Sequence, residues 1–333
     1  MLIPGRTVYS ALLRVLVETL PDAWWPLATR LVLVFAGGAA LVVATNLIAG
    51  RRRASERDRS NAGARSSLWP RFGVWASITA VLLAAIGFGA GAFGLVMAIT
   101  TAQAIREVAG AVRHTVPYRT WALALAGGAI VAATGFWQTT GGLAAAVAAV
   151  VVLRLAGLPR GRTRDVILAM ALDAAVVAYI AVPIALLVDL RAAPDGFALV
   201  IWAIVVVGLA DVAAMFGGLL AGWTPVFATI SPSKTVEGFA AAVVGALGAA
   251  ALVRVALPDV PDVAYYGATL AVAAAGIVGD LGASAMKRRA GIKDFGTALA
   301  GHGGVMDRLD SLIVAAPVAV ACVLVLFAAR SSS

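Results

Sequence analysis

Long apolar runs separated by short polar segments dominate the chain. An α-helix rises about 1.5 Å per residue, so roughly 20 apolar residues cross the hydrocarbon core of a bilayer. The pattern therefore predicts an all-α, polytopic integral membrane protein of about ten transmembrane helices. We expect these helices at roughly 27–50, 72–88, 89–108, 120–137, 140–158, 165–189, 196–218, 236–257, 263–288 and 308–329.

The composition supports this class. The chain is 62% hydrophobic and 13% charged, whereas soluble domains contain roughly 45 to 50% apolar residues. Little room remains for a soluble domain between the predicted helices. The single cysteine, Cys322, lies in the last apolar run, which excludes an intrachain disulfide and favours a packing role.

The basic residues predict the orientation in the membrane. They gather in alternate polar segments, while the segments between these are uncharged or acidic. The positive-inside rule places the basic segments in the cytoplasm and both termini outside. This alternation requires the apolar stretch near Gly87–Gly94 to be split between two helices. A net charge of +9 distributed in this way indicates membrane topology and no nucleic-acid partner.

The polar residues also divide the chain into two regions. Residues 1–115 contain N-terminal spans with a basic cytoplasmic loop at 51–71. Contact of this loop with anionic lipids is left as an alternative. Residues 116–333 form a second membrane-embedded region, in which the unusual polar motifs lie within 208–311.

One segment near the end of the chain concentrates charge. Asp280, Ser284 and Lys287 are spaced i, i+4, i+7, so one helix face carries all three. Asp307 and Asp310 follow at i, i+3 at the start of the next predicted helix. Charged groups near a bilayer are costly unless they are paired, hydrated or bound to a charged ligand. Clustered carboxylates beside cations suit a magnesium ion and phosphates. The alternative is an anchor of basic residues with surface ion pairs, but Asp280 ends an apolar run where an anchor has no use for a carboxylate.

The same segment resembles the signature of the phosphatidate cytidylyltransferases, also called CDP-diacylglycerol synthases. The matching residues are Ser284, Lys287, Arg288, Lys293, Asp294, Gly296, Leu299, His302, Gly303, Gly304, Asp307, Arg308, Leu309 and Asp310. Further upstream, Ser231, Pro232, Lys234, Thr235, Glu237 and Gly238 look like a loop motif of this family, and Asp211 with Phe216 resembles another. The chain departs from the family pattern at Met215, Ser233 and Ala300, which puts the lipid substrate in more doubt than the reaction.

The resemblance implies a nucleotidyltransferase that transfers CMP from CTP to phosphatidate, giving CDP-diacylglycerol and pyrophosphate. It implies that Asp280 and Asp307 bind Mg²⁺, with Asp310 as a further carboxylate. A second cofactor, a monovalent cation such as K⁺, is left as an option. Lys287, Arg288 and Arg308 would hold phosphates. The remaining substrate-binding candidates are Ser231, Lys234, Ser284, Lys293, His302 and Asp211. We also expect Glu237 to orient Lys234.

The expected location is the inner (plasma) membrane, with the active site facing the cytoplasm and membrane lipids around it. A related activity on an ether-lipid or polyprenyl phosphate remains an alternative, and so does a membrane transporter, since charge within membranes also marks ion pathways. A homodimer is left open. Glu107, beside Arg106, is expected to be interfacial.

Overall fold

The computed structural model describes residues 26, 29–30, 68–112, 117–137, 163–227, 231–298 and 303–331. Its contacts divide into two compact units, 1–88 and 89–333. In the first unit, helix α3 covers Leu68–Gly87. The second unit contains all the predicted site residues. The sequence regions 1–115 and 116–333 stay a prediction.

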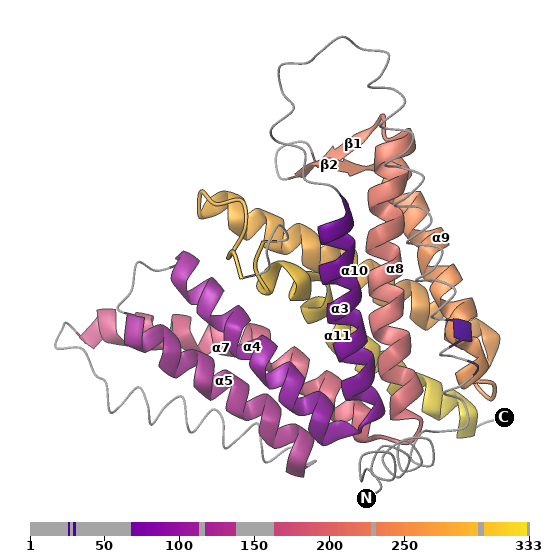
Figure 1. Cartoon of the computed structure of the whole chain (residues 1–333), viewed down its shortest axis with the longest axis horizontal. Helices are drawn as coiled ribbons and strands as arrows, with labels where there is room; N and C mark the ends of the chain where they lie inside the picture. Colours follow the sequence, from indigo (N-terminus) through magenta and orange to yellow (C-terminus); the bar gives the residue numbers. More distant parts are fainter. Residues whose placement is uncertain are drawn as a thin grey trace, which may run out of the picture. The chain divides into compact units, whose positions relative to one another are not determined.

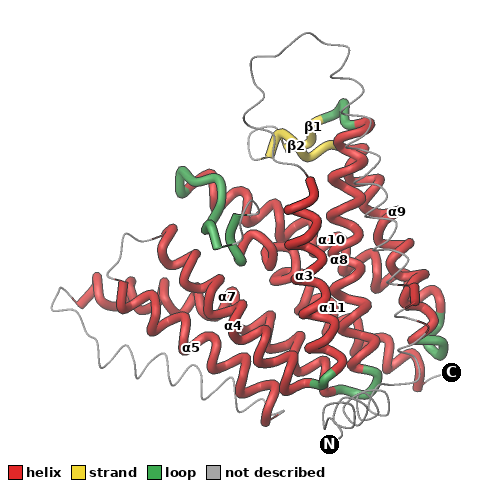
Figure 2. The backbone as a smooth tube through the Cα atoms, viewed as in Figure 1, coloured by secondary structure: helices red, strands yellow, loops and turns green. Residues whose placement is uncertain are grey.

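The second unit is built from helices, shown in sequence colours in Figure 1 and by type in Figure 2. They are α4 (Ala90–Val112), α5 (Pro117–Trp137), α7 (Thr163–Ala192), α8 (Gly196–Ala221), α9 (Val236–Val253), α10 (Asp262–Arg289) and α11 (Met306–Ser331). Within the described residues, six helices are long and apolar enough to cross a membrane: α4, α7, α8, α9, α10 and α11. The expected all-α membrane architecture is confirmed.

Most of the expected spans coincide with observed helices, including the pair 72–88 and 89–108. The helical conformation is interrupted between them at Gly89. Its φ of +109° is accessible to glycine and strained for other residues. The spans expected at 140–158 and over most of 27–50, and most of the loop at 51–71, lie outside the described residues. The total of about ten helices therefore stays a prediction.

Helices of the second unit pack through small residues. α8 packs against α9, α4 against α5, and α10 against α11. At Gly245 in α9, an added Cβ would lie 2.5 Å from Cβ of Ala213 in α8. At Gly94 in α4, it would lie 2.9 Å from Cα of Gly135 in α5. Small residues let helix backbones approach closely in membranes, where no hydrophobic effect drives association.

A short hairpin connects α8 to α9. Strand β1 (Pro225–Phe227) pairs antiparallel with strand β2 (Ser231–Thr235). We had interpreted this segment as a loop, so the strand pairing was missed. Thr235 then caps α9, because its Oγ1 accepts a hydrogen bond from Gly238 N–H at 3.1 Å. The cap fixes the position of Lys234 immediately before the helix.

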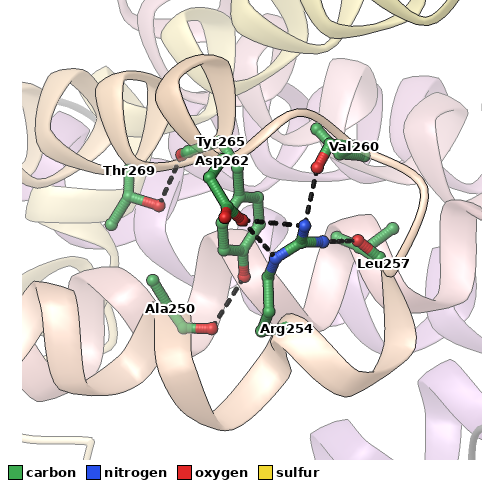
Figure 3. Close-up of polar contacts among 7 residues, drawn as sticks. All are labelled: Ala250, Arg254, Leu257, Val260, Asp262, Tyr265 and Thr269. Atoms are coloured by element: carbon green, nitrogen blue, oxygen red, sulfur yellow. Dashed lines mark hydrogen bonds and ion pairs between the residues drawn. The ribbon is translucent and has the colours of Figure 1, made fainter.

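Arg254 fixes the connection from α9 to α10 at the other end of these helices (Figure 3). Its guanidinium donates to the carbonyls of Leu257 and Val260, and its Nε and Nη2 donate to Asp262 Oδ1 at 3.1 and 2.9 Å. It also lies over the ring of Tyr265, 5.2 Å from the centroid. The planar guanidinium suits this set of acceptors. Arg254 therefore fixes the end of α9 relative to the start of α10.

Candidate active site

Four helix ends bring the predicted site residues together. The second half of α8 carries Asp211, the end of α10 carries Asp280 and Lys287, and the start of α11 carries Asp307. Lys234 lies in β2, just before the start of α9, and forms an ion pair with Asp280. Residues separated by long stretches of sequence thus meet at one end of the bundle, as the alternation of helix directions requires.

A buried ion pair joins α10 to α11. Lys287 Nζ lies 2.7 Å from Asp307 Oδ1, and the two side chains are only 13% and 4% exposed. The other oxygen, Oδ2 of Asp307, accepts hydrogen bonds from Phe295 N–H at 3.0 Å and Gly304 N–H at 2.9 Å. Buried charges are stable only when they are paired and hydrogen-bonded. Asp307 meets this requirement through the turn between the helices.

Three carboxylates form a second part of the site. Asp211, Asp280 and Asp310 lie near enough to interact electrostatically with one another. α10 and α11 approach closely here, because a Cβ added at Gly279 would lie 3.0 Å from Cα of Ser311. Ser311 Oγ donates to Asp211 Oδ2 at 2.9 Å, which links α11 to α8.

Cations surround these three carboxylates. Asp211 interacts with Lys234 and Arg308, and Asp310 interacts with Lys287. Carboxylates in such proximity repel one another unless positive charge compensates them. In the described part of the chain, no group of three or more His, Cys, Asp or Glu side chains is already arranged as a metal centre. The arrangement can nevertheless attract a cation, and its lysines and arginines can attract phosphates.

The other predicted residues have these positions. Ser284 is half-buried on α10, between Asp280 and Lys287 on the predicted face, and Ser231 is half-buried at the start of β2. The side chains of Arg288, Lys293 and Arg308 are exposed at the same end of the bundle. His302 lies outside the described residues.

Glu237 does not orient Lys234, contrary to our expectation. Its carboxylate accepts hydrogen bonds from the Thr224 hydroxyl at 2.9 Å and from Trp223 and Thr224 N–H at 3.3 Å. It thereby ties the start of α9 to the segment before β1, while Lys234 binds Asp280.

Glu107 has a contact that we did not predict. We expected it at the membrane interface beside Arg106, and its depth in the membrane stays a prediction; within the protein its side chain is buried, only 8% exposed. Its Oε2 accepts a hydrogen bond from Met306 N–H at 2.9 Å, across 199 residues of sequence. The one available signal was a carboxylate close to an apolar run, and that signal gives no information about its partner.

Comparison with known proteins identifies the family. A sequence model described as "Cytidylyltransferase family" matches residues 69–326. The chain belongs to the cytidylyltransferase family. The family expected from the motifs is thus confirmed, and the matched range contains every predicted site residue of this cytidylyltransferase-family chain.

Three curated relatives carry the name phosphatidate cytidylyltransferase. The chain is 42% identical to that of Helicobacter pylori over 124 residues, which cover 36% of this chain and 45% of the relative. It is 40% identical to that of Bacillus subtilis over 123 residues, covering 37% and 46%. It is 34% identical to that of Staphylococcus aureus over 146 residues, covering 42% and 54%. The chain spans about half the length of the curated relatives it matches.

Proposed function

We propose that this protein is a CTP:phosphatidate cytidylyltransferase. The observation that carries the proposal is the meeting of Lys234, Lys287 and Arg308 with Asp211, Asp280 and Asp310, inside the region that matches the cytidylyltransferase family. The names of the relatives supply the lipid substrate.

The proposed reaction exchanges one phosphate linkage for another. A phosphate oxygen of phosphatidate attacks the α-phosphorus of CTP, and the bond from this phosphorus to the oxygen bridging to the β-phosphate breaks. CDP-diacylglycerol and pyrophosphate result. The attacking oxygen is already ionised near neutral pH, so no strong general base is needed. Such reactions depend mainly on positioning and on neutralising the charge of the phosphates.

The basic side chains would provide this neutralisation. Lys234 and Lys287 are each held by a carboxylate, Asp280 and Asp307, so both amines are positioned before substrate binds. Arg288 and Arg308 are exposed and would meet the phosphates as CTP enters. We assign Ser231, Ser284, Lys293 and His302 to the lining of the substrate pocket.

The carboxylates offer suitable donor atoms for a divalent cation, although in the described residues they are not gathered into a ready-made metal centre. Asp211, Asp280 and Asp310 supply the oxygen donors that Mg²⁺ prefers, and their mutual repulsion favours a cation among them. When bound, Mg²⁺ would act as a Lewis acid toward the triphosphate. Asp307 stays in our proposed set, but it already accepts three hydrogen bonds, from Lys287, Phe295 and Gly304. A cation at Asp307 would therefore require Lys287 to turn away.

We further propose that the site faces the cytoplasm from the inner membrane. The basic residues Lys234, Lys287, Arg288, Arg289, Lys293 and Arg308 lie at this end of the bundle, and the positive-inside rule assigns such residues to the cytoplasm. CTP would then enter from the cytosol and the lipid from the inner leaflet.

A labelling assay tests the reaction. The purified full chain in lipid nanodiscs receives CTP labelled at the α-phosphate, with phosphatidate, with an ether-lipid phosphate, or with a polyprenyl phosphate. We expect label in the lipid fraction with phosphatidate and Mg²⁺, and none after addition of EDTA. Label in only another lipid would identify the alternative acceptor. Folded protein that labels no lipid would contradict the proposal, and ion or solute uptake into liposomes would then favour a transporter.

A further inference from the structure

Glu107 is a buried carboxylate on a helix that carries none of the sequence motifs. It lies on α4, a helix apolar enough to cross a membrane, and its side chain is 8% exposed. Burying an ionised carboxylate is costly unless several donors compensate it. The hydrogen-bond donors around the Glu107 carboxylate therefore indicate its structural role.

Two donors hold Glu107 in place. Gln103, one helical turn earlier, donates from Nε2 to Oε1 at 2.8 Å. Met306 donates its backbone N–H to Oε2 at 2.9 Å. Met306 is the first residue of α11, and the first N–H groups of a helix have no partner within the helix. The negative charge also favours this position, because the helix N-terminus carries a partial positive charge.

Two glycines leave the space that Glu107 occupies. A Cβ added at Gly296 would lie 2.6 Å from Cδ of Glu107, and one at Gly304 would overlap Oε2. Contacts this short are not seen for real Cβ atoms, so a larger residue at either glycine would displace Glu107 or the backbone. The segments on both sides of the turn from α10 to α11 are thus shaped around this carboxylate.

The same turn also contacts the catalytic candidates. Gly304 N–H and Phe295 N–H both donate to Asp307, and Asp307 holds Lys287. A continuous set of contacts therefore runs from Glu107 on α4 through Gly304 and Met306 to the Lys287–Asp307 pair.

We propose that Glu107 is a positioning residue for the cytidylyltransferase reaction: it fixes the turn before α11, and through this turn the geometry of the Lys287–Asp307 ion pair. This inference rests on the proposed function for its effect on catalysis. Its structural part, the anchoring of the turn by α4, can be measured without any activity.

The test compares Glu107→Ala and Glu107→Gln with Gly110→Ala, in the purified full chain. Gly110 lies on the same helix and an added Cβ there meets nothing within 4 Å, so it serves as the control. Hydrogen exchange of peptides covering 292–307 is measured without substrate, together with kcat and KM for CTP. Exchange across the α9–α10 connection reports on global stability.

We expect Glu107→Ala to accelerate exchange around Gly304 and Met306 while leaving the α9–α10 connection unchanged. We expect kcat to fall about 10- to 100-fold, by analogy with the loss of groups that orient metal ligands in other enzymes. Glu107→Gln should restore most of the protection and of kcat, because its amide oxygen can still accept from Met306 N–H once Gln103 reorients. Gly110→Ala should behave as wild type.

Several outcomes would overturn the proposal. One is unchanged exchange and kcat in Glu107→Ala, and another is equal loss in both Glu107 variants. If Glu107→Ala does not fold, the variants Glu107→Gln and Gly304→Ala decide. The proposal is supported if peptides covering 292–307 stay protected from hydrogen exchange in Glu107→Gln and lose protection in Gly304→Ala. The reverse result contradicts it. If wild-type protein transfers no CMP, the proposed function fails, and the exchange result still decides the anchoring.

Discussion

Lysine and aspartate side chains neutralise one another at the candidate site before any substrate arrives. Lys234 binds Asp280 and Lys287 binds Asp307, so two cations are held by carboxylates in a partly buried setting. Negative phosphates or a metal ion would alter this balance, since both compete for the same partners. If the proposed function holds, we expect binding of substrate to be coupled to the exchange of ion pairs.

Replacing Asp280 with Asn keeps the shape of the side chain and removes its charge. Lys234 would lose its partner, and the carboxylate cluster would lose one member. We expect Mg²⁺-dependent transfer of CMP to fall at least about 100-fold, comparable to the loss of a main electrostatic group in other enzymes. Asp189→Asn, at an exposed position on α7, is the matched control. Normal turnover by Asp280→Asn, measured with labelled CTP, would exclude the metal and ion-pair roles together.

Lys287→Ala removes a buried amine next to the predicted phosphate site. Hydrogen bonds between charged groups contribute about 1.5 to 3 kcal/mol, so kcat/KM for CTP should decrease roughly 10- to 100-fold. Lys287→Arg should recover part of this loss because it keeps the charge. Arg289→Ala removes an exposed cation from the same last turn of α10 and should change little. Equal effects in Lys287→Ala and Arg289→Ala, from steady-state kinetics, would indicate general attraction of CTP instead of a specific contact.

At the scale of elements, the packing of α8 against α9 sets the distance between Asp211 and Lys234. Gly245→Ala would place a Cβ 2.5 Å from Cβ of Ala213 and 2.6 Å from O of Leu209, forcing the helices apart. Overpacking of this kind costs about 1 to 3 kcal/mol. We expect a lower melting temperature and reduced CMP transfer, measured on the same preparation. Gly248→Ala, on the same helix with open space around it, should leave both values unchanged.

The Arg254 connection allows stability to be separated from catalysis. Arg254→Ala removes the donor to Leu257 and Val260, and we expect a loss of about 1 to 3 kcal/mol. Asp262→Asn should cost less than about 1 kcal/mol, because the Asp262 side chain is 72% exposed. Thermal unfolding measures both variants. A larger loss in Asp262→Asn than in Arg254→Ala would show that the ion pair, and not the carbonyl contacts, holds the connection.

Hydropathy predicted the helices well because crossing a membrane imposes one length and one composition on each span. It also predicted the shared face of Asp280, Ser284 and Lys287, since this depends only on helical periodicity. The β1–β2 hairpin was missed because β1 has only three residues and the polar strand β2 carries no alternating pattern. The contact from Glu107 to Met306 could not be predicted, because tertiary packing alone joins residues 199 positions apart.

On the scale of the whole molecule, the two ends of the bundle differ in their content of lysine and arginine. Beside its carboxylates, the end with the candidate site carries Lys234, Lys287, Arg288, Arg289 and Lys293, while the α9–α10 connection carries Arg254 with Asp259 and Asp262. From this asymmetry the positive-inside rule predicts an orientation with the candidate site at the cytoplasmic side.

Single cysteines at the two ends of α10 test this orientation. Lys293 and Asp259 are both exposed and flank a helix long enough to span the membrane, so we expect them on opposite sides of the bilayer. With Cys322 replaced by Ala, a membrane-impermeant maleimide should label Asp259→Cys in intact cells. Lys293→Cys should react only after the membrane is permeabilised. The reverse pattern would place the candidate site outside, away from cytosolic CTP, and labelling of both positions in intact cells would show that α10 does not cross the membrane.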